Sequence, residues 1–163
     1  MDKAIQGYPL SSAGPQSEGS RQNEDKWNLN NFTYKLPDKE KLSFFVFHKE
    51  KIIGYMIASS YNNKTHLNRI AILDEYQGYG LGKKFMQLLE ETTKQLRLKE
   101  VTLSTLNKGE EDKIVLFYEK LGYKILKTEK EIDIFLKAKN KIEDKKYFYP
   151  YEESKLIIMS KKI

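Results

Sequence analysis

The chain has 163 residues, of which 39% are hydrophobic and 32% are charged, a composition typical of a globular protein and not of a disordered or collagen-like one. The absence of cysteine excludes disulfides, iron–sulfur clusters and thiolate zinc sites, and two histidines leave little for a metal centre, so we expect no metal. The net charge of +6 comes mainly from lysine, which suits an anionic ligand better than arginine-based recognition of nucleic acid.

The beginning of the chain differs in composition from the rest. Residues 1–31 are rich in Ser, Gln, Asn, Gly and Pro, which predicts a flexible leader followed by a single domain at 32–163. The amino end lacks the apolar core of a signal peptide, and the longest apolar stretch, 52–58, is far short of the ~18 residues that cross a bilayer. We therefore expect a cytoplasmic protein without membrane contacts.

The first regular elements are predicted to be strands. Two β-prone runs, at 42–46 and 51–60, predict a β-hairpin joined by a short polar connection at 48–50. Asn62 and Asn63 tolerate positive φ and predict a tight turn into a third strand over 67–73. The order of these runs predicts an antiparallel meander.

A strand–helix–strand unit follows the meander. Beyond Gly82 the apolar residues follow helical spacing, at Phe85, Leu88, Leu89, Thr92 and Leu96. The alternating run 101–106 (VTLSTL) predicts the next strand, which should lie parallel to the strand at 67–73 because a helix connects the two. The pattern therefore predicts a mixed α/β sheet.

The last part of the domain predicts one more helix and two strands. The helix begins near Asp112, ends at Gly122, and carries an apolar face made by Ile114, Phe117, Tyr118 and Leu121. Strands are predicted at 123–128 and 155–161. Between them a short helix is indicated by Ile132, Phe135, Leu136 and Ile142.

Three glycines lie between the third strand and the helix that follows it. The segment 76–84 (YQGYGLGKK) has the wrong spacing for a dinucleotide fold, since Lys83 occupies the last glycine position, and it also lacks the P-loop spacing. A short loop leading into a helix amino terminus can bind a pyrophosphate through exposed N–H groups. The alternative is that the glycines serve only the turn.

Two segments resemble a known family. The run 77–82 (QGYGLG) resembles the Q/R-x-x-G-x-G/A pattern with which GNAT superfamily N-acetyltransferases bind the pyrophosphate of acetyl-CoA, and the run 117–123 (FYEKLGY) resembles the FYxKxGF helix end of that family. The resemblance implies a GNAT-like acyl-CoA N-acyltransferase fold, with a V-shaped splay between its two parallel strands. It covers about 42–163 and is weakest at 129–150.

The resemblance also implies which residues hold the donor, acetyl-CoA. Backbone groups of Ile70, Ala71 and Ile72 would bind the pantetheine arm, and the N–H near Ile72 would polarise the thioester carbonyl. Asn107 would replace an asparagine that relatives often carry at the position of Glu111. The pyrophosphate would be bound by the amides of Gln77, Gly78, Tyr79, Gly80, Leu81, Gly82 and Lys83.

Two residues are catalytic candidates. Tyr118 matches the tyrosine that in many family members gives a proton to the coenzyme A thiolate, although a tyrosine four residues after Ile114 could also be a core residue. His66 lies near the position where histone-type relatives carry a glutamate, but four residues before Ile70 it could act as a base only through water or on an extended acceptor. The alternative bases are Glu152 and Glu153, which would reach the acceptor only if their loop folds over the cleft, and water.

The function implied is transfer of an acetyl group from acetyl-CoA to a primary amine by direct attack in a ternary complex. The acceptor would be a small molecule or a peptide, and the protein a monomer or homodimer. One alternative is a non-catalytic acyl-CoA-binding module. Another is a nucleic-acid-binding domain, suggested by the +6 charge and the aromatic run 145–151.

Overall fold

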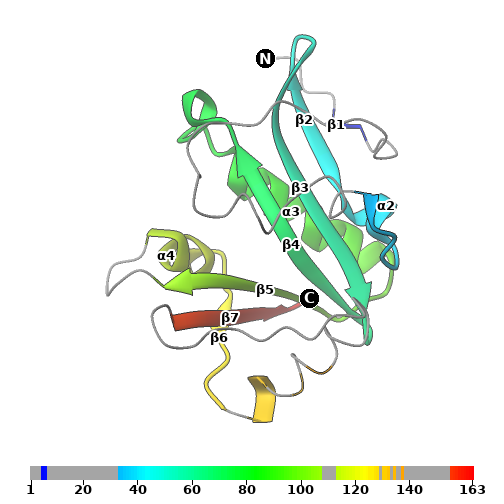
Figure 1. Cartoon of the computed structure of the whole chain (residues 1–163), viewed down its shortest axis with the longest axis vertical. Helices are drawn as coiled ribbons and strands as arrows, with labels where there is room; N and C mark the ends of the chain where they lie inside the picture. Colours follow the sequence, from blue (N-terminus) through cyan, green and yellow to red (C-terminus); the bar gives the residue numbers. More distant parts are fainter. Residues whose placement is uncertain are drawn as a thin grey trace.

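The computed structural model describes residues 5–6, 33–107, 113–128 and 155–163, together with 130–132, 134 and 137. Within these residues the strands form one sheet in the order β1-β2-β3-β4-β5-β7-β6 (Figure 1). The strands are β1 (Ile5–Gln6), β2 (Phe44–His48), β3 (Lys51–Tyr61), β4 (Lys64–Ile72), β5 (Glu100–Asn107), β6 (Lys124–Ile125) and β7 (Lys155–Lys162). The helices are α2 (Lys39–Leu42), α3 (Leu81–Gln95) and α4 (Lys113–Lys120), and a 3-10 turn, η2, spans Asp74–Tyr76.

The predicted meander is confirmed. β2 pairs with β3 and β3 with β4, both antiparallel, and the second turn is made by Asn62 and Asn63 with φ angles of 42° and 61°. Leu42, predicted to begin the first strand, instead ends α2, because its N–H is bonded to the carbonyl of Asp38 and its side chain is fully buried. A short helix, and not a strand, therefore places this apolar residue in the core.

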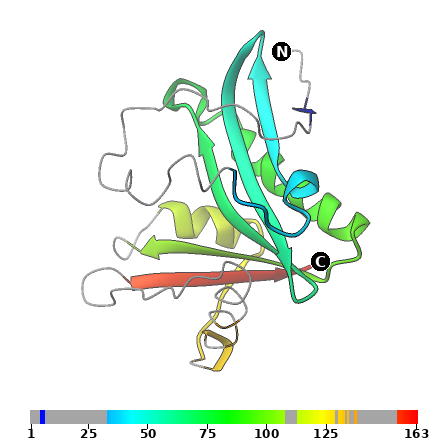
Figure 2. The same ribbon diagram turned by 45° about the vertical axis from the view of Figure 1, so that its right-hand side comes forward.

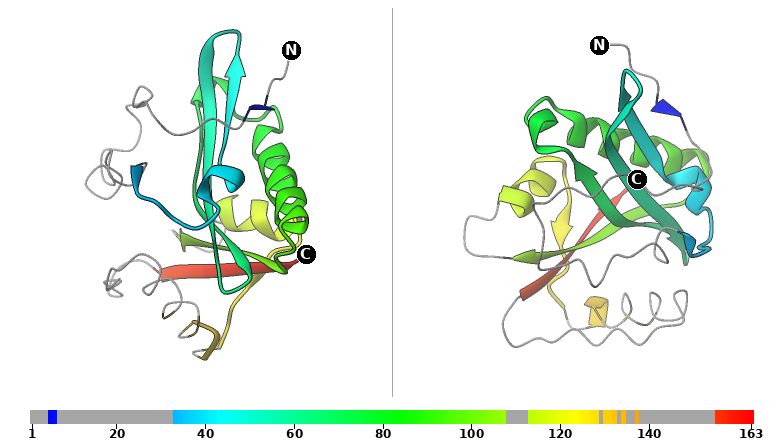
Figure 3. Two further views of the ribbon diagram at one scale, coloured as in Figure 1. Left: turned by 90° about the vertical axis from the view of Figure 1, so that its right-hand side faces the viewer. Right: turned by 45° about the horizontal axis from the view of Figure 1, so that its top comes forward.

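The predicted strand–helix–strand unit is also confirmed. β4 and β5 are parallel, and β5 pairs antiparallel with β7 along its whole length. Figure 3 shows α3 and α4 on the same face of the sheet. The core between helices and sheet includes Met56, Phe85, Met86, Leu89, Val101, Leu103 and Met159.

β4 and β5 pair only at their beginnings. Their register joins Thr65–Leu67 of β4 to Val101–Leu103 of β5, and both strands then continue without pairing to each other. The separation is visible in two views (Figures 1 and 2).

Just past the last pair, Asn68 is an extra residue relative to β3, and its Nδ2 donates to Ser59 Oγ over 3.0 Å. Because a bulge bends its strand, Asn68 marks the point where β4 turns away from β5. The expected V-shaped splay is present.

Two expectations about the edges of the fold need correction. The predicted apolar face of α4 was wrong at Ile114, which is 50% exposed while Val115 is buried, but Tyr118 is buried as expected and Phe117 and Leu121 pack against the core. β6 spans Lys124–Ile125 and not 123–128, because Tyr123 N–H bonds to the Tyr118 carbonyl at the end of α4 and the register with β7 holds only Lys124 and Ile125. Within the predicted leader, β1 pairs with β2.

The predicted short helix lies largely outside the described residues. Positions 130–132, 134 and 137 are helical, which agrees with the expectation at Ile132. Phe135, Leu136 and Ile142, as well as the aromatic run 145–151, fall outside the described part of the chain.

Candidate active site

Among the strands that the structure describes, none pairs with the β5-facing edge at the end of β4. Ile70, Ala71 and Ile72 pair with β3 on one side, while the edge toward β5 is beyond the last parallel pair. The side chains of Ile70 and Ile72 pack against the core. Backbone groups along such an edge can bind an added extended segment, as in strand addition. The opening between β4 and β5 can therefore accept a ligand arm through main-chain contacts.

Gln77 shapes the loop that follows β4. Its Nε2 donates to the carbonyl of Ile72 over 3.0 Å and to Asp74 Oδ1 over 2.8 Å, and its backbone N–H donates to the Asp74 carbonyl over 3.1 Å. The side-chain amide and the backbone N–H of Gln77 are thus both used inside the loop. The backbone N–H is therefore not available for the anion-binding role expected for it. Gln77 instead fastens the loop to the end of β4, next to the opening.

The glycine loop delivers the amino terminus of α3 to this point. Gly78 and Gly80 have φ angles of 81° and 79°, a left-handed conformation that glycine adopts without strain. The first helical bond runs from Lys84 N–H to the Gly80 carbonyl. The amides of the first helical turn, Leu81 to Lys83, precede the regular bonding pattern and carry the positive end of the helix dipole. This loop is suited to bind an anion.

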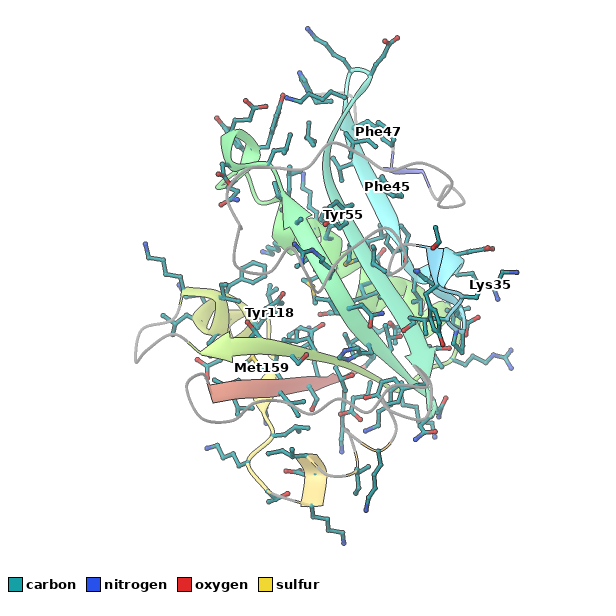
Figure 4. All side chains as sticks on the ribbon, in the orientation of Figure 1. Lys35, Phe45, Phe47, Tyr55, Tyr118 and Met159 are labelled. Carbon is teal, nitrogen blue, oxygen red and sulfur yellow. The ribbon has the colours of Figure 1, made fainter. Side chains whose placement is uncertain are left out.

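Helix α4 packs against the start of α3 and the end of β4. A Cβ on Gly82 would lie 3.3 Å from Phe117 Cζ and 3.8 Å from Ile72 Cδ1, so α4, the start of α3 and the end of β4 meet there. The next residue, Tyr118, is 5% exposed, and burial raises its pKa to about 12. Tyr118 belongs to α4 and lies where β4 diverges from β5 (Figure 4). The structure brings together the expected donor-binding segments and Tyr118.

A family model described as acetyltransferase (GNAT) domain matches residues 40–125, more than half of the chain. The chain belongs to the GNAT acetyltransferase family. It is 34% identical over 84 residues to the uncharacterised protein YyaT of Bacillus subtilis (strain 168), covering 52% of this chain and 53% of that one. The chain thus spans about half the length of this curated relative.

Two solved structures show the shared GNAT fold. One, from Bacillus cereus ATCC 14579, is an IAA acetyltransferase with 14% identity and a TM-score of 0.65, covering 99% of this chain and 100% of that chain. The other, from Bacillus anthracis and assigned as a streptothricin acetyltransferase, was solved in complex with acetyl coenzyme A. It has 20% identity and a TM-score of 0.55, covering 74% of this chain and 62% of that chain.

His66 lies at the closed end of the GNAT splay. It belongs to the paired part of β4, opposite Thr102, and is 3% exposed. Its Nδ1 lies 3.1 Å from Thr102 Oγ1, and its ring meets that of Tyr61 edge-on at 6.0 Å. The bulge at Asn68 separates it from Ile70. The structure therefore places His66 in a buried polar cluster, apart from the open half of the splay.

The remaining expected residues are accounted for as follows. Asn107 is the last residue of β5, and its side chain lies outside the described part of the chain, as does Glu111. Tyr79 is 65% exposed on the loop. In the ranges that the structure describes, no group of three His, Asp or Glu side chains could hold a metal ion, and no helix is long and apolar enough to cross a membrane.

The sequence analysis missed Asn68 and the side-chain role of Gln77. It also missed Glu90, which accepts hydrogen bonds from Tyr123 and Lys161. A signal was present for Glu90, because it follows buried Met86 by four residues and therefore borders the buried face of α3. For Gln77, the side-chain contacts carry no local sequence signal beyond the motif itself.

Replacing Gly80 with alanine should weaken coenzyme A binding about tenfold. Alanine at this φ costs about 1 kcal/mol of folding free energy, and the loop would shift the amides of α3 to relieve it. Gly122→Ala is the matched control: its φ is 89°, and at both sites a Cβ would meet no atom closer than 3.5 Å. Both variants should lose similar stability, and calorimetry should find weaker binding in Gly80→Ala alone. Equal affinity in the two would contradict the loop's role.

The raised pKa of Tyr118 predicts a stability difference at alkaline pH. Its pKa of about 12 lies above the ordinary value of 10.0, so the neutral phenol adds stability that is complete below about pH 10 and is lost as the pH rises toward 12. Between pH 9.5 and 11.5 this loss amounts to about 2 kcal/mol. Thermal unfolding followed by circular dichroism should show a shallower alkaline decline in Tyr118→Phe than in the wild type. Identical declines in the two proteins would contradict a raised pKa of Tyr118 in the folded state.

Proposed function

We propose that this GNAT chain is an acetyl-CoA-dependent N-acetyltransferase that acetylates a primary amine in a ternary complex. The observation that carries the proposal is the splay of β4 and β5 at Asn68, with the amino terminus of α3 and Tyr118 at its open end. Acyl transfer needs a held donor, a polarised carbonyl and a proton for the leaving thiolate. Each requirement has a candidate at this opening.

The donor would lie across the α3 loop and along β4. Its pyrophosphate would accept from the amides between Gly78 and Lys83, and its pantetheine arm would pair with the free edge of β4. The N–H near Ile72 would polarise the thioester carbonyl. Support comes from the positive φ angles of the loop and from the end of the β4–β5 ladder at Leu67 and Leu103.

The chemical step would be direct attack by the neutral amine. A bond forms between the amine nitrogen and the thioester carbon, and the carbon–sulfur bond breaks. The thiolate takes the proton of the Tyr118 hydroxyl, and the amine's surplus proton returns through water to the Tyr118 phenolate. A pKa of about 12 keeps Tyr118 protonated at neutral pH, which a proton donor requires.

The acceptor would approach from the sheet face opposite α3. Helices α3 and α4 cover one face (Figure 3), while the other carries Phe45 and Tyr55, whose ring centroids lie 6.4 Å apart (Figure 4). Tyr55 pairs with Ala71 in the backbone ladder, so these aromatic rings border the end of β4. We therefore place a small-molecule or peptide amine on this side.

The test is incubation of the protein with acetyl-CoA and a panel of small-molecule and peptide amines. Release of free thiol, together with an acetylated product seen by mass spectrometry, is expected with at least one amine. Calorimetry with coenzyme A runs in parallel. Tight binding without turnover on any amine would favour a non-catalytic acyl-CoA-binding module, and the absence of both would contradict the site.

A further inference from the structure

A second tyrosine at the end of α4 is held by an ion pair between two other elements. Tyr123 is 2% exposed, and its hydroxyl donates to Glu90 Oε1 over 3.2 Å. Glu90 lies on α3, and its Oε2 accepts from Lys161 Nζ of β7 over 2.8 Å. The same Nζ lies 5.7 Å from the centroid of the Tyr123 ring. We call Glu90, Tyr123 and Lys161 the Glu90 clamp.

The clamp is in direct contact with Tyr118. The rings of Tyr123 and Tyr118 meet edge-on, with centroids 5.8 Å apart and planes at 67°, and Phe117 also meets Tyr118 at 5.1 Å. Tyr123 N–H donates to the carbonyl of Tyr118 over 3.1 Å. Tyr123 thus contacts both the ring and the backbone of Tyr118.

The clamp also keeps the proton on the Tyr123 hydroxyl. Burial, and after it the carboxylate of Glu90, raises the pKa of Tyr123, so its proton stays on the hydroxyl and is donated to Glu90. Without Glu90 the buried hydroxyl of Tyr123 would lose its acceptor and Lys161 its carboxylate. The Tyr123 ring would then turn to find another partner, and Tyr118 would lose the edge-on contact that limits its own motion.

We propose that Glu90 and Lys161, acting through Tyr123, are positioning residues that hold the Tyr118 ring at the opening between β4 and β5. The proposal rests on the proposed function in one respect, that Tyr118 is the proton donor. The clamp joins α3, which carries the glycine loop, to α4, which carries Tyr118. It therefore sets the place of the proton donor relative to the bound thioester.

Kinetics of Glu90→Ala test the proposal, with Glu91→Ala, an exposed neighbour on α3, as the matched control. Glu90→Ala should lower kcat about tenfold at unchanged KM for acetyl-CoA, and Glu90→Gln, whose amide oxygen still accepts from Tyr123, should retain most of kcat. In a Tyr118→Phe background, Glu90→Ala should lower kcat no further. An equal fall in both backgrounds would show a general structural effect and overturn the proposal.

A second measurement does not depend on turnover. In protein labelled with ring-13C tyrosine, the Tyr118 resonance is identified by its loss in Tyr118→Phe. Glu90→Ala should shift or broaden that resonance, and Glu91→Ala should not. An unchanged resonance in folded Glu90→Ala overturns the clamp's role, whereas a shifted resonance in a protein without turnover on any amine contradicts the proposed function alone. If Glu90→Ala does not fold, Lys161→Met carries the same measurement.

Discussion

Replacing Tyr118 with phenylalanine is expected to lower kcat for acetyl transfer about a hundredfold or more, at nearly unchanged KM for acetyl-CoA. The substitution removes the proton donor for the thiolate but keeps the ring that packs against Phe117 and Tyr123. Donor binding depends on the α3 loop and β4, which the substitution does not touch. Steady-state kinetics across a range of acetyl-CoA concentrations separate the two constants.

Tyr34→Phe controls for the loss of a phenol hydroxyl elsewhere, since Tyr34 is 42% exposed and is not among the donor-binding residues. It should keep the wild-type kcat. Far-ultraviolet circular dichroism checks that Tyr118→Phe is folded. A folded Tyr118→Phe with wild-type kcat would show that another group protonates the thiolate, and the assignment of Tyr118 would be withdrawn.

Phe85→Ala is expected to cost about 3–5 kcal/mol of unfolding free energy. Phe85 is 1% exposed on the first turns of α3, and its Cε2 lies 3.3 Å from where a Cβ on Gly54 would be. Truncation would leave a cavity between α3 and β3, and α3, which follows the glycine loop, would lose this packing contact with the sheet. Urea unfolding measures the loss, and affinity for coenzyme A should fall with it.

Gln87→Ala is the control for this stability effect. Gln87 is exposed on the same helix, so its truncation removes no core contact and should change the unfolding free energy by less than about 0.5 kcal/mol. A loss below about 1 kcal/mol in Phe85→Ala would mean that the core closes around the missing ring. In that case the position of α3 would depend on its other buried residues.

Turns and helix ends could be predicted because they depend on neighbouring residues. Asn62 and Asn63 adopt the positive φ angles that their type tolerates, and Gly122 ends α4 with a φ of 89°. The glycine loop belongs to the same class, since the left-handed conformations of Gly78 and Gly80 follow from the absence of a side chain. Local sequence was sufficient at these points.

Features set by distant contacts could not be predicted in this way. In the eight-residue helix α4, Ile114 and Val115 are equally apolar, and the sheet decides that Val115 is buried. The splay was expected from the family resemblance, because no local pattern records where two strands stop pairing. The Glu90–Lys161 pair joins residues 71 positions apart, which hydrophobic periodicity does not reveal.

β4 reverses the parity of its side chains at Asn68. Before it, odd-numbered residues face α3, as Thr65 does by bonding to Thr93, and after it the even-numbered Ile72 faces Phe85. Because Asn68 is the extra residue, deleting it would restore regular alternation, with Thr65 and Ile72 still facing α3, and would let the ladder with β5 continue. The sheet could therefore exchange its opening for longer pairing without exposing its core, so this one-residue deletion should remove coenzyme A binding while the protein stays folded.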